Sequence, residues 1–411
     1  MAIISLSRFL VKDRIQHLTD EEVNQLRQAS RQDDAFAQYG YGRWLYYLNP
    51  YQGAMKDAEE LFFKTKDVLP DSMAAYALMI RYGETVSTRP SEMDIEEYQK
   101  LLLQAKEQGS LLASVQYARD RIYGTFCEAE PIKVTEEIEK LLSENPNSDS
   151  FWYLLLAFAY EAANRPEDAE KMYERALELG ELDSYFYLAN IYQKKGNTAL
   201  AEEYFEDGCS KGCTMCLLYQ SDMDAEEYES LNESTQSQIH QNIDERLRRG
   251  LQMGEGYCAY YLWKHYKNGN LGYPKNEDKA FSYLKRGIEL GNTFCITQMA
   301  IAAQYGGLPE NMSLSPCEIG ELWLQAARYD IDSEAIIELN EVTDDLFMSK
   351  HKNEIKKYWE PRFFELFESE EDSDDKGNNP DEDSWYNPRD DFFDHWKNDD
   401  DEDDGRFDAY V

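Results

Sequence analysis

The sequence contains few histidines, no long apolar run and no excess of positive charge, and each absence excludes a class of protein. Five of the 411 residues are histidine, and none is spaced for a metal-binding helix or placed beside an evident nucleophile. No stretch approaches the roughly 18 apolar residues of a membrane-spanning helix. The 7 cysteines are an odd number, which does not fit a disulfide scaffold. We therefore predict no catalytic residue, no cofactor and no metal.

The shortage of basic residues constrains the choice of partner. The chain has 42 Lys and Arg against 81 Asp and Glu, a formal net charge of −39. Phosphate groups would be repelled by this charge, so we expect neither direct nucleic-acid binding nor insertion into an anionic membrane. A protein or peptide partner, possibly a basic one, is the natural expectation.

The N-terminal residues carry no recognisable export signal. Arg8 and Lys12 interrupt the first apolar run before it reaches the length of a signal-peptide core. Together with the lack of a membrane span, this predicts a cytoplasmic protein.

Two successive units in the middle of the chain carry the same residue types 32 positions apart. Within each unit the first residues share one face of a helix, and the later ones share one face of a second helix after a polar turn. The matching residues are Tyr153, Leu156, Ala157, Tyr160, Ala169 and Tyr173 in one unit and Tyr185, Leu188, Ala189, Tyr192, Ala201 and Phe205 in the next. Each unit is therefore a predicted helical hairpin.

These residues resemble the tetratricopeptide repeat in both type and spacing. Towards both ends of the chain the period lengthens to 37 residues, and extra residues such as 270–274 enter the turn between the paired helices. This variant resembles the Sel-one-like repeat, a relative with a longer inner loop. The resemblance implies a right-handed superhelical solenoid that works by holding another protein.

A residue early in each first helix, small in every unit except the one with Trp152, marks the predicted repeats. The markers fall at positions 37, 74, 113, 152, 184, 216, 258 and 295, which gives about eight hairpins. The units at 113 and 216 are defined mainly by spacing, since Arg121 stands where a buried aromatic is expected. We predict a capping helix over residues 1–30, the solenoid over 31–348 and a closing helix over 349–367, interrupted near Pro361. If each hairpin contacts only its neighbours, the molecule is elongated.

The composition changes after Phe367. Residues 368–411 carry 19 acidic and 4 basic residues, so we expect this acidic tail to be disordered in isolation. Aromatic residues scattered through it make up a candidate motif: Trp385, Phe392, Phe393 and Trp396. Three interpretations remain open, namely a solvated terminus, a segment that docks into its own solenoid, and a segment that binds a partner.

Cys209, Cys213 and Cys216 are the one cluster that suggests a metal, because thiolates at such gaps can share zinc. No fourth ligand is obvious, and Cys216 and Cys258 both fall at the small-residue marker of the repeat. Cysteine at that position acts as a compact apolar side chain. We therefore interpret these thiols as packing residues.

The resemblance also indicates where a partner would bind. In this superfamily the first helices of successive hairpins line a concave groove, and their residues off the packing face contact the ligand. By register, the candidates are Phe151, Leu154, Phe158, Phe186, Asn190, Gln193, Lys194, Tyr257, Tyr260, Lys264 and Lys267. The predicted function is a non-enzymatic scaffold or adaptor. The alternatives are an acidic inhibitor or immunity-type protein that neutralises a cationic enzyme, and an uncatalogued enzyme.

Overall fold

Eight pairs of antiparallel helices follow one another along the part of the chain that the structure describes. The computed structural model describes residues 5–89, 92–309, 312–329 and 333–364, so the acidic tail and its motif, Trp385, Phe392, Phe393 and Trp396, lie outside the described residues. The described chain forms helices and no strand. The all-α fold predicted from the repeats is therefore confirmed.

Each hairpin pairs an odd-numbered first helix with the next, even-numbered helix. The first helices are α3 (Ala35–Leu48), α5 (Pro70–Arg81), α7 (Leu111–Tyr123), α9 (Phe151–Ala162), α11 (Ser184–Lys194), α13 (Thr214–Glu227), α15 (Gly256–Asn268) and α17 (Thr293–Gln304). The second helices are α4 (Ala54–Thr65), α6 (Ile95–Glu107), α8 (Pro131–Glu144), α10 (Pro166–Glu178), α12 (Thr198–Lys211), α14 (Glu233–Gln252), α16 (Glu277–Glu289) and α18 (Pro316–Tyr329). All eight marker positions lie early in a first helix, including those defined mainly by spacing.

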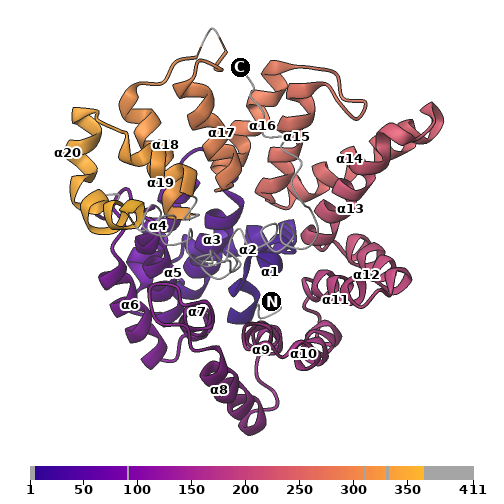
Figure 1. The fold of residues 1–411 in the computed structure, drawn as a ribbon. Helices are drawn as coiled ribbons and strands as arrows, with labels where there is room; N and C mark the ends of the chain where they lie inside the picture. The colour runs from indigo at the N-terminus through magenta and orange to yellow at the C-terminus, as the bar shows by residue number, and fades with distance from the viewer. Residues whose placement is uncertain (1–4, 90–91, 310–311, 330–332, 365–411) are drawn as a thin grey trace, which may run out of the picture.

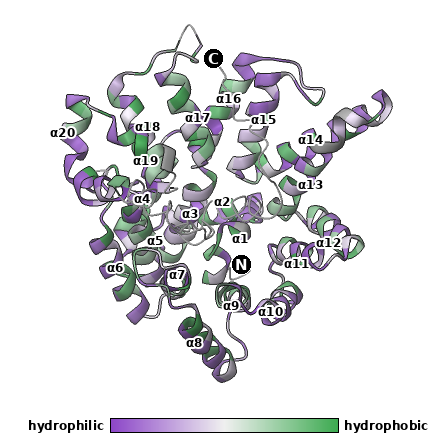
Figure 2. Ribbon diagram, in the orientation of Figure 1, coloured by the Kyte–Doolittle hydropathy of each residue, from purple (hydrophilic) through white to green (hydrophobic). Residues whose placement is uncertain are grey.

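Local sequence sets where these helices begin. Asp94 and Ser110 stand before α6 and α7, and each side-chain oxygen accepts a hydrogen bond from the backbone N–H three residues on. Pro131 and Pro166 occupy the first turn of α8 and α10, where no intrahelical N–H bond is lost. Most helices then carry apolar stretches beside polar ones, as Figure 2 shows, and the apolar side packs against the neighbouring helix.

Arg121 is buried in the position where an aromatic residue was expected. Its guanidinium donates to Glu130 at 2.7 Å and to Glu137 at 2.7 and 3.0 Å, and its planar face lies 5.4 Å from the ring of Tyr117. The aliphatic part of the side chain fills the gap while carboxylates at the rim neutralise the charge. The hairpin at 113 therefore keeps its shape without the usual residue.

Glycine and cysteine let successive hairpins approach closely. A Cβ atom on Gly250 would lie 2.4 Å from the sulfur of Cys258, and one on Gly208 would lie 2.4 Å from the sulfur of Cys216. In both cases the glycine is on a second helix and the cysteine is on the first helix of the next hairpin. The thiol thus fills the space that a missing Cβ leaves, as the packing interpretation of these cysteines requires.

At both ends of the described chain, the structure differs from the single capping helix that the sequence predicted. Residues 5–30 form three short segments, η1 (Leu6–Phe9), α1 (Lys12–Gln16) and α2 (Asp20–Ser30), instead of one helix. After α18 come α19 (Ser333–Asn340) and α20 (Asp345–Glu354), which continues through a π-helical turn, η3 (Ile355–Trp359), into helix up to residue 364. The irregular turn lies just before Pro361, and the helix passes through the proline.

The last two hairpins meet the first two, so the solenoid closes into a ring. Arg286 on α16 donates to the carbonyl oxygens of Leu48 and Asn49 at the end of α3, at 2.7 Å in both cases. Asn49 donates in return to the carbonyl oxygen of Glu289 at 2.6 Å. Figure 1 shows α18 to α20 beside α4 to α6. The expectation that each hairpin contacts only its neighbours, and hence that the molecule is elongated, is wrong.

A second set of contacts, which we call the seam, joins α5 to α18 and α20. The hydroxyl groups of Tyr46 and Tyr329 each donate a hydrogen bond to the buried carboxyl group of Glu84, at 2.7 and 2.5 Å. Arg328 forms a buried bidentate ion pair with Glu354 at 2.7 and 2.6 Å. Burial raises the pKa of Glu84 to about 8. The contact between Tyr329 and Glu84 therefore forms only when the ring is closed, whereas Arg328 and Glu354 both belong to the C-terminal helices.

Candidate binding site

The N-terminal segment runs through the middle of the ring. Phe9 is fully buried, and its ring packs edge-on against Phe36 and Tyr39 with centroids 5.6 and 5.9 Å apart. Gly40 leaves room for it, since a Cβ there would lie 2.6 Å from the ring. The segment is therefore anchored on α3 and reaches across to the later hairpins.

Arg14 connects this segment to the middle repeats. Its guanidinium forms a bidentate ion pair with Asp149 at 2.7 and 3.1 Å, and it also contacts Glu181 and the hydroxyl of Ser150. All three charged side chains are at most 13% exposed. Burial opposes the charge on Arg14, but the hydrogen bonds that its guanidinium donates to Asp149 and Glu181 outweigh this effect and raise the pKa of Arg14. Two hairpins are thus held by one cation from the N-terminal segment.

Lys12 makes the corresponding contact with a later hairpin. Its ammonium group lies 2.9 Å from the carboxylate of Glu255, which also accepts a hydrogen bond from the backbone N–H of Tyr257 at 3.2 Å, at the start of α15. Lys12 and Arg14 therefore tie hairpins from different parts of the ring to one short segment.

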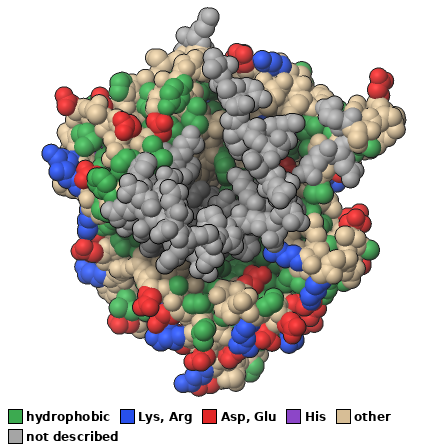
Figure 3. All heavy atoms as spheres, viewed as in Figure 1, with side chains coloured by type: hydrophobic (Ala, Val, Ile, Leu, Met, Phe, Trp, Pro, Cys, Tyr) green, Lys and Arg blue, Asp and Glu red, His purple; other side chains and the backbone are tan. Residues whose placement is uncertain are grey.

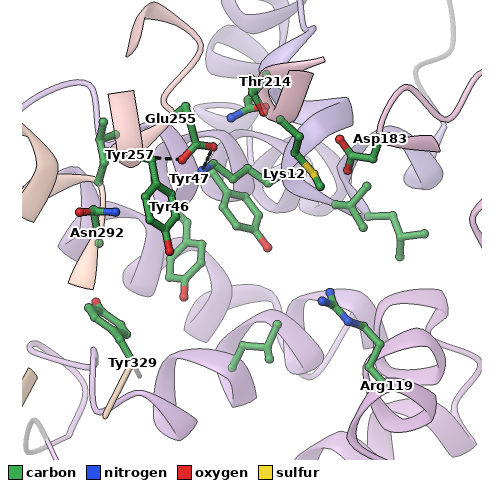
Figure 4. A pocket seen from close by; sticks show the side chains of 18 of the residues that line it. Lys12, Tyr46, Tyr47, Arg119, Asp183, Thr214, Glu255, Tyr257, Asn292 and Tyr329 are labelled. Carbon is green, nitrogen blue, oxygen red and sulfur yellow. Dashed lines mark hydrogen bonds and ion pairs between the residues drawn. The ribbon is translucent and has the colours of Figure 1, made fainter. Parts of the chain in front are cut away.

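A cavity of about 250 Å³ remains beside this segment. Its wall is built from the inner faces of seven of the eight first helices, together with Leu10, Val11, Lys12 and Gln16 of the N-terminal segment. Figure 4 shows that the labelled side chains converge on one space from opposite sides. The repeats thus enclose a cavity where an open superhelix would have an open groove.

The wall of the cavity is mainly aromatic and aliphatic, with charges on opposite sides. Tyrosine is the commonest aromatic residue of the wall: Tyr46, Tyr47, Tyr82, Tyr187, Tyr257 and Tyr329. Arg119 enters from α7, while Asp183 and the Lys12–Glu255 pair lie across from it. An occupant can therefore bury apolar surface and also meet a charge of either sign.

Four of the predicted groove residues line this cavity, namely Phe151, Leu154, Phe158 and Tyr257. Phe186 is buried against Phe205 and Tyr219, Gln193 accepts a hydrogen bond from the hydroxyl of Tyr219 at 3.2 Å, and Asn190 is half-buried. Tyr260 packs on Trp263 and Phe294 at 5.4 and 5.3 Å. The side chains of Lys194, Lys264 and Lys267 are exposed. The structure thus brings together the predicted residues of α9 and the one at the start of α15.

The sequence interpretation missed the wall residues that do not lie on the inner faces of the first helices. Tyr82 follows α5, Tyr329 ends α18, and Lys12 belongs to the N-terminal segment. None of these positions follows the repeat register that identified the groove. Arg119 does follow it, because it lies seven residues after Leu112, another lining residue on α7.

The clustered thiols are not among the residues that line the cavity. Cys213 and Cys216 are buried and Cys209 is half-buried, and burial raises the pKa of Cys209 to about 12. Within the described ranges, no three side chains of His, Cys, Asp or Glu are placed to hold a metal ion. None of the helices described is both long and apolar enough to cross a membrane.

The repeat units in the middle of the ring match a known family. The family model described as tetratricopeptide repeat matches residues 153–179 and 182–210, which cover α9 with α10 and α11 with α12. The chain contains tetratricopeptide repeats. A comparison with curated protein sequences gives no match.

Solved structures with similar helical repeats share little sequence with this chain. A protective antigen of uropathogenic Escherichia coli that displays an SLR fold is 16% identical, with 87% of this chain and 79% of that chain covered and a TM-score of 0.38. A Sel1 repeat protein from Oxalobacter formigenes is 15% identical over 66% of this chain and 98% of its own, with a TM-score of 0.33. The Cut9–Hcn1 assembly gives 11% identity over 81% and 62%, with a TM-score of 0.40.

Proposed function

We propose that the chain is a non-enzymatic scaffold that holds a segment of a partner protein in the central cavity. The observation that carries the proposal is the wall itself, because the inner faces of seven first helices converge on one cavity. Tetratricopeptide-repeat proteins typically act as protein-interaction scaffolds. The groove residues predicted from register would contribute Phe151, Leu154, Phe158 and Tyr257 to the contact.

The size of the cavity indicates what part of a partner it would take. A volume of about 250 Å³ is slightly below the range of pockets that bury a drug-sized ligand, roughly 300–1,000 Å³. It therefore suits one or two anchoring side chains of a peptide segment. The net charge of −39 would favour a partner with a basic surface around that segment, because the acidic outer face would attract it.

Capture of partners from native extract tests this proposal. Arg119→Glu and Met215→Asp each change a side chain of the cavity wall, and we expect either variant to retain at least tenfold less of a partner that the unmodified chain captures. Lys140→Glu and Leu179→Asp introduce the same acidic residues in place of a basic and an apolar side chain at exposed positions on α8 and after α10. These two control variants should capture the partner as well as the unmodified chain does. Circular dichroism of all variants checks that the helices are intact. Equal capture by the two pairs would exclude the cavity as the binding site.

A further inference from the structure

We propose that residues 385–396 of the same chain compete for the central cavity in cis and thereby regulate access to it. The inference rests on the proposed function, since it names an occupant for the same site. The segment combines aromatic side chains with acidic ones, and it lies in the part of the sequence beyond the described residues. Three observations carry the proposal: the charge of the inner faces, the place where the described chain ends, and the composition of the segment.

The inner faces of three first helices carry basic side chains beside the cavity. Lys194 lies seven residues after Tyr187 on α11, and Lys264 lies seven residues after Tyr257 on α15, so each lysine shares a helix face with a lining tyrosine. Arg119 is itself part of the wall. The wall also carries Asp183, Glu255 and Glu289, so the acidic side chains of a bound segment would have to face Arg119 and the two lysines while its aromatic rings enter the apolar part of the cavity.

An aromatic and basic surface continues from the cavity along α15. Phe294 is 36% exposed and packs between Tyr257 and Tyr260, with ring centroids 5.7 and 5.3 Å away. The ammonium group of Lys267, an exposed side chain, lies 4.7 Å from the centre of the Trp263 ring. A carboxylate placed here could pair with Lys267, while an aromatic ring could stack on Phe294.

The described chain ends close to the cavity wall. The guanidinium of Arg362 lies 5.6 Å from the ring of Phe126, in the loop that follows α7. Since α7 has 13 residues, it is about 20 Å long, and its inner face supplies Leu112, Val115 and Arg119 to the cavity. Residues 365–384 can span up to roughly 70 Å. The segment that follows can therefore reach the cavity.

The composition of the segment matches this surface. Phe392, Phe393 and Trp396 stand among Asp390, Asp391 and Asp394. A tethered segment experiences an effective concentration on the order of 1 mM, so weak contacts suffice to occupy the site. A partner would then have to displace the segment. The apparent affinity for the partner falls in proportion to the fraction of chains in which the cavity is free.

A labelled peptide of residues 385–397 tests the proposal with full-length chains. In one chain Phe392→Ser, Phe393→Ser and Trp396→Ser disable the internal segment while every charge is kept. Fluorescence anisotropy should show that the peptide binds this chain at least tenfold more tightly than the unmodified chain, whose own segment competes. Adding Arg119→Glu to the disabled chain should weaken peptide binding at least tenfold, whereas adding Lys140→Glu should not.

Two results would overturn the proposal: equal binding of the peptide to the disabled and unmodified chains, or no binding to the disabled chain at millimolar concentration. Either result leaves the proposed function standing if Arg119→Glu still abolishes capture of a foreign partner. Conversely, peptide binding without capture of any partner would reject the scaffold proposal and retain the internal contact. The two inferences therefore fail separately.

Discussion

Replacement of Arg14 by methionine should destabilise the chain by about 3–5 kcal/mol, the cost of removing one partner from a buried ion-pair network. Methionine keeps most of the hydrocarbon volume but removes the guanidinium that contacts Asp149, Ser150 and Glu181. Two carboxylates at most 13% exposed then remain without their cation. Urea unfolding followed by circular dichroism measures the loss.

The matched control removes the charges as well as the cation. The triple variant Arg14→Met, Asp149→Asn, Glu181→Gln leaves no buried charge behind, so it should recover most of the stability that the single variant loses. If the single variant is as stable as the unmodified chain, the N-terminal segment does not hold the middle hairpins. If the triple variant is no more stable than the single one, the loss comes from packing and the ion pairs are unimportant.

Glu84→Gln should abolish a decrease in stability that the unmodified chain shows between about pH 4.5 and pH 8. Burial raises the pKa of Glu84 from its ordinary 4.5 to about 8, although the hydrogen bond from Tyr329 and the charge of Arg328 act in the opposite direction. Because the folded chain keeps this proton longer than the unfolded chain, the contribution of Glu84 is fully present below pH 4.5. It is then lost as the pH rises through 8, by about 1.4 kcal/mol per pH unit within that window.

Denaturant unfolding at pH 5, 6.5 and 8 measures this difference. The free energy of unfolding of Glu84→Gln relative to the unmodified chain should rise with pH by a few kcal/mol, because glutamine stays neutral while glutamate must ionise in a buried site. Parallel curves for the two chains would show that Glu84 is solvated and that the seam is open in solution. A matched change at an exposed carboxylate, Glu144→Gln, should give parallel curves.

The helical hairpins could be predicted because their signals are local. Alanine and tyrosine at helical spacing mark a face, and the 32- and 37-residue periods place each hairpin after the previous one. Even the hairpin with Arg121 was placed correctly by spacing. In that case neighbouring carboxylates, Glu130 and Glu137, stabilise a residue that breaks the pattern.

Closure of the ring could not be predicted, because it depends on contacts between residues far apart in the sequence. Arg328 reaches the carbonyl oxygen of Gly83 at 3.3 Å across 245 positions. A small rotation per hairpin accumulates over eight repeats and decides whether the ends meet, and no single residue encodes that rotation. The prediction of an open, elongated solenoid failed for this reason.

The candidate site was partly predictable, because some of its residues follow the local repeat register and others are placed by ring closure. Phe151, Leu154, Phe158 and Tyr257 follow the repeat register and line the cavity. Lys12 has no periodic signal and enters the wall only because the N-terminal segment crosses the ring. The seam tyrosine Tyr329 becomes part of the wall only through closure. Register therefore predicts which face of a helix points inward, and tertiary closure decides what lies opposite.

Zero-length coupling of lysines to carboxylates tests most directly the central claim that the hairpins close into a ring around a cavity. Carbodiimide treatment of the single-chain species should join Lys357 to Glu96, whose charged atoms lie 2.8 Å apart, and Lys12 to Glu255, 2.9 Å apart. The helical pair Lys140 and Glu144 reports whether the chemistry works. Mass spectrometry that finds both long-range products supports the closed ring. Products that join only residues of the same or adjacent hairpins, with the helical pair coupled, would contradict it.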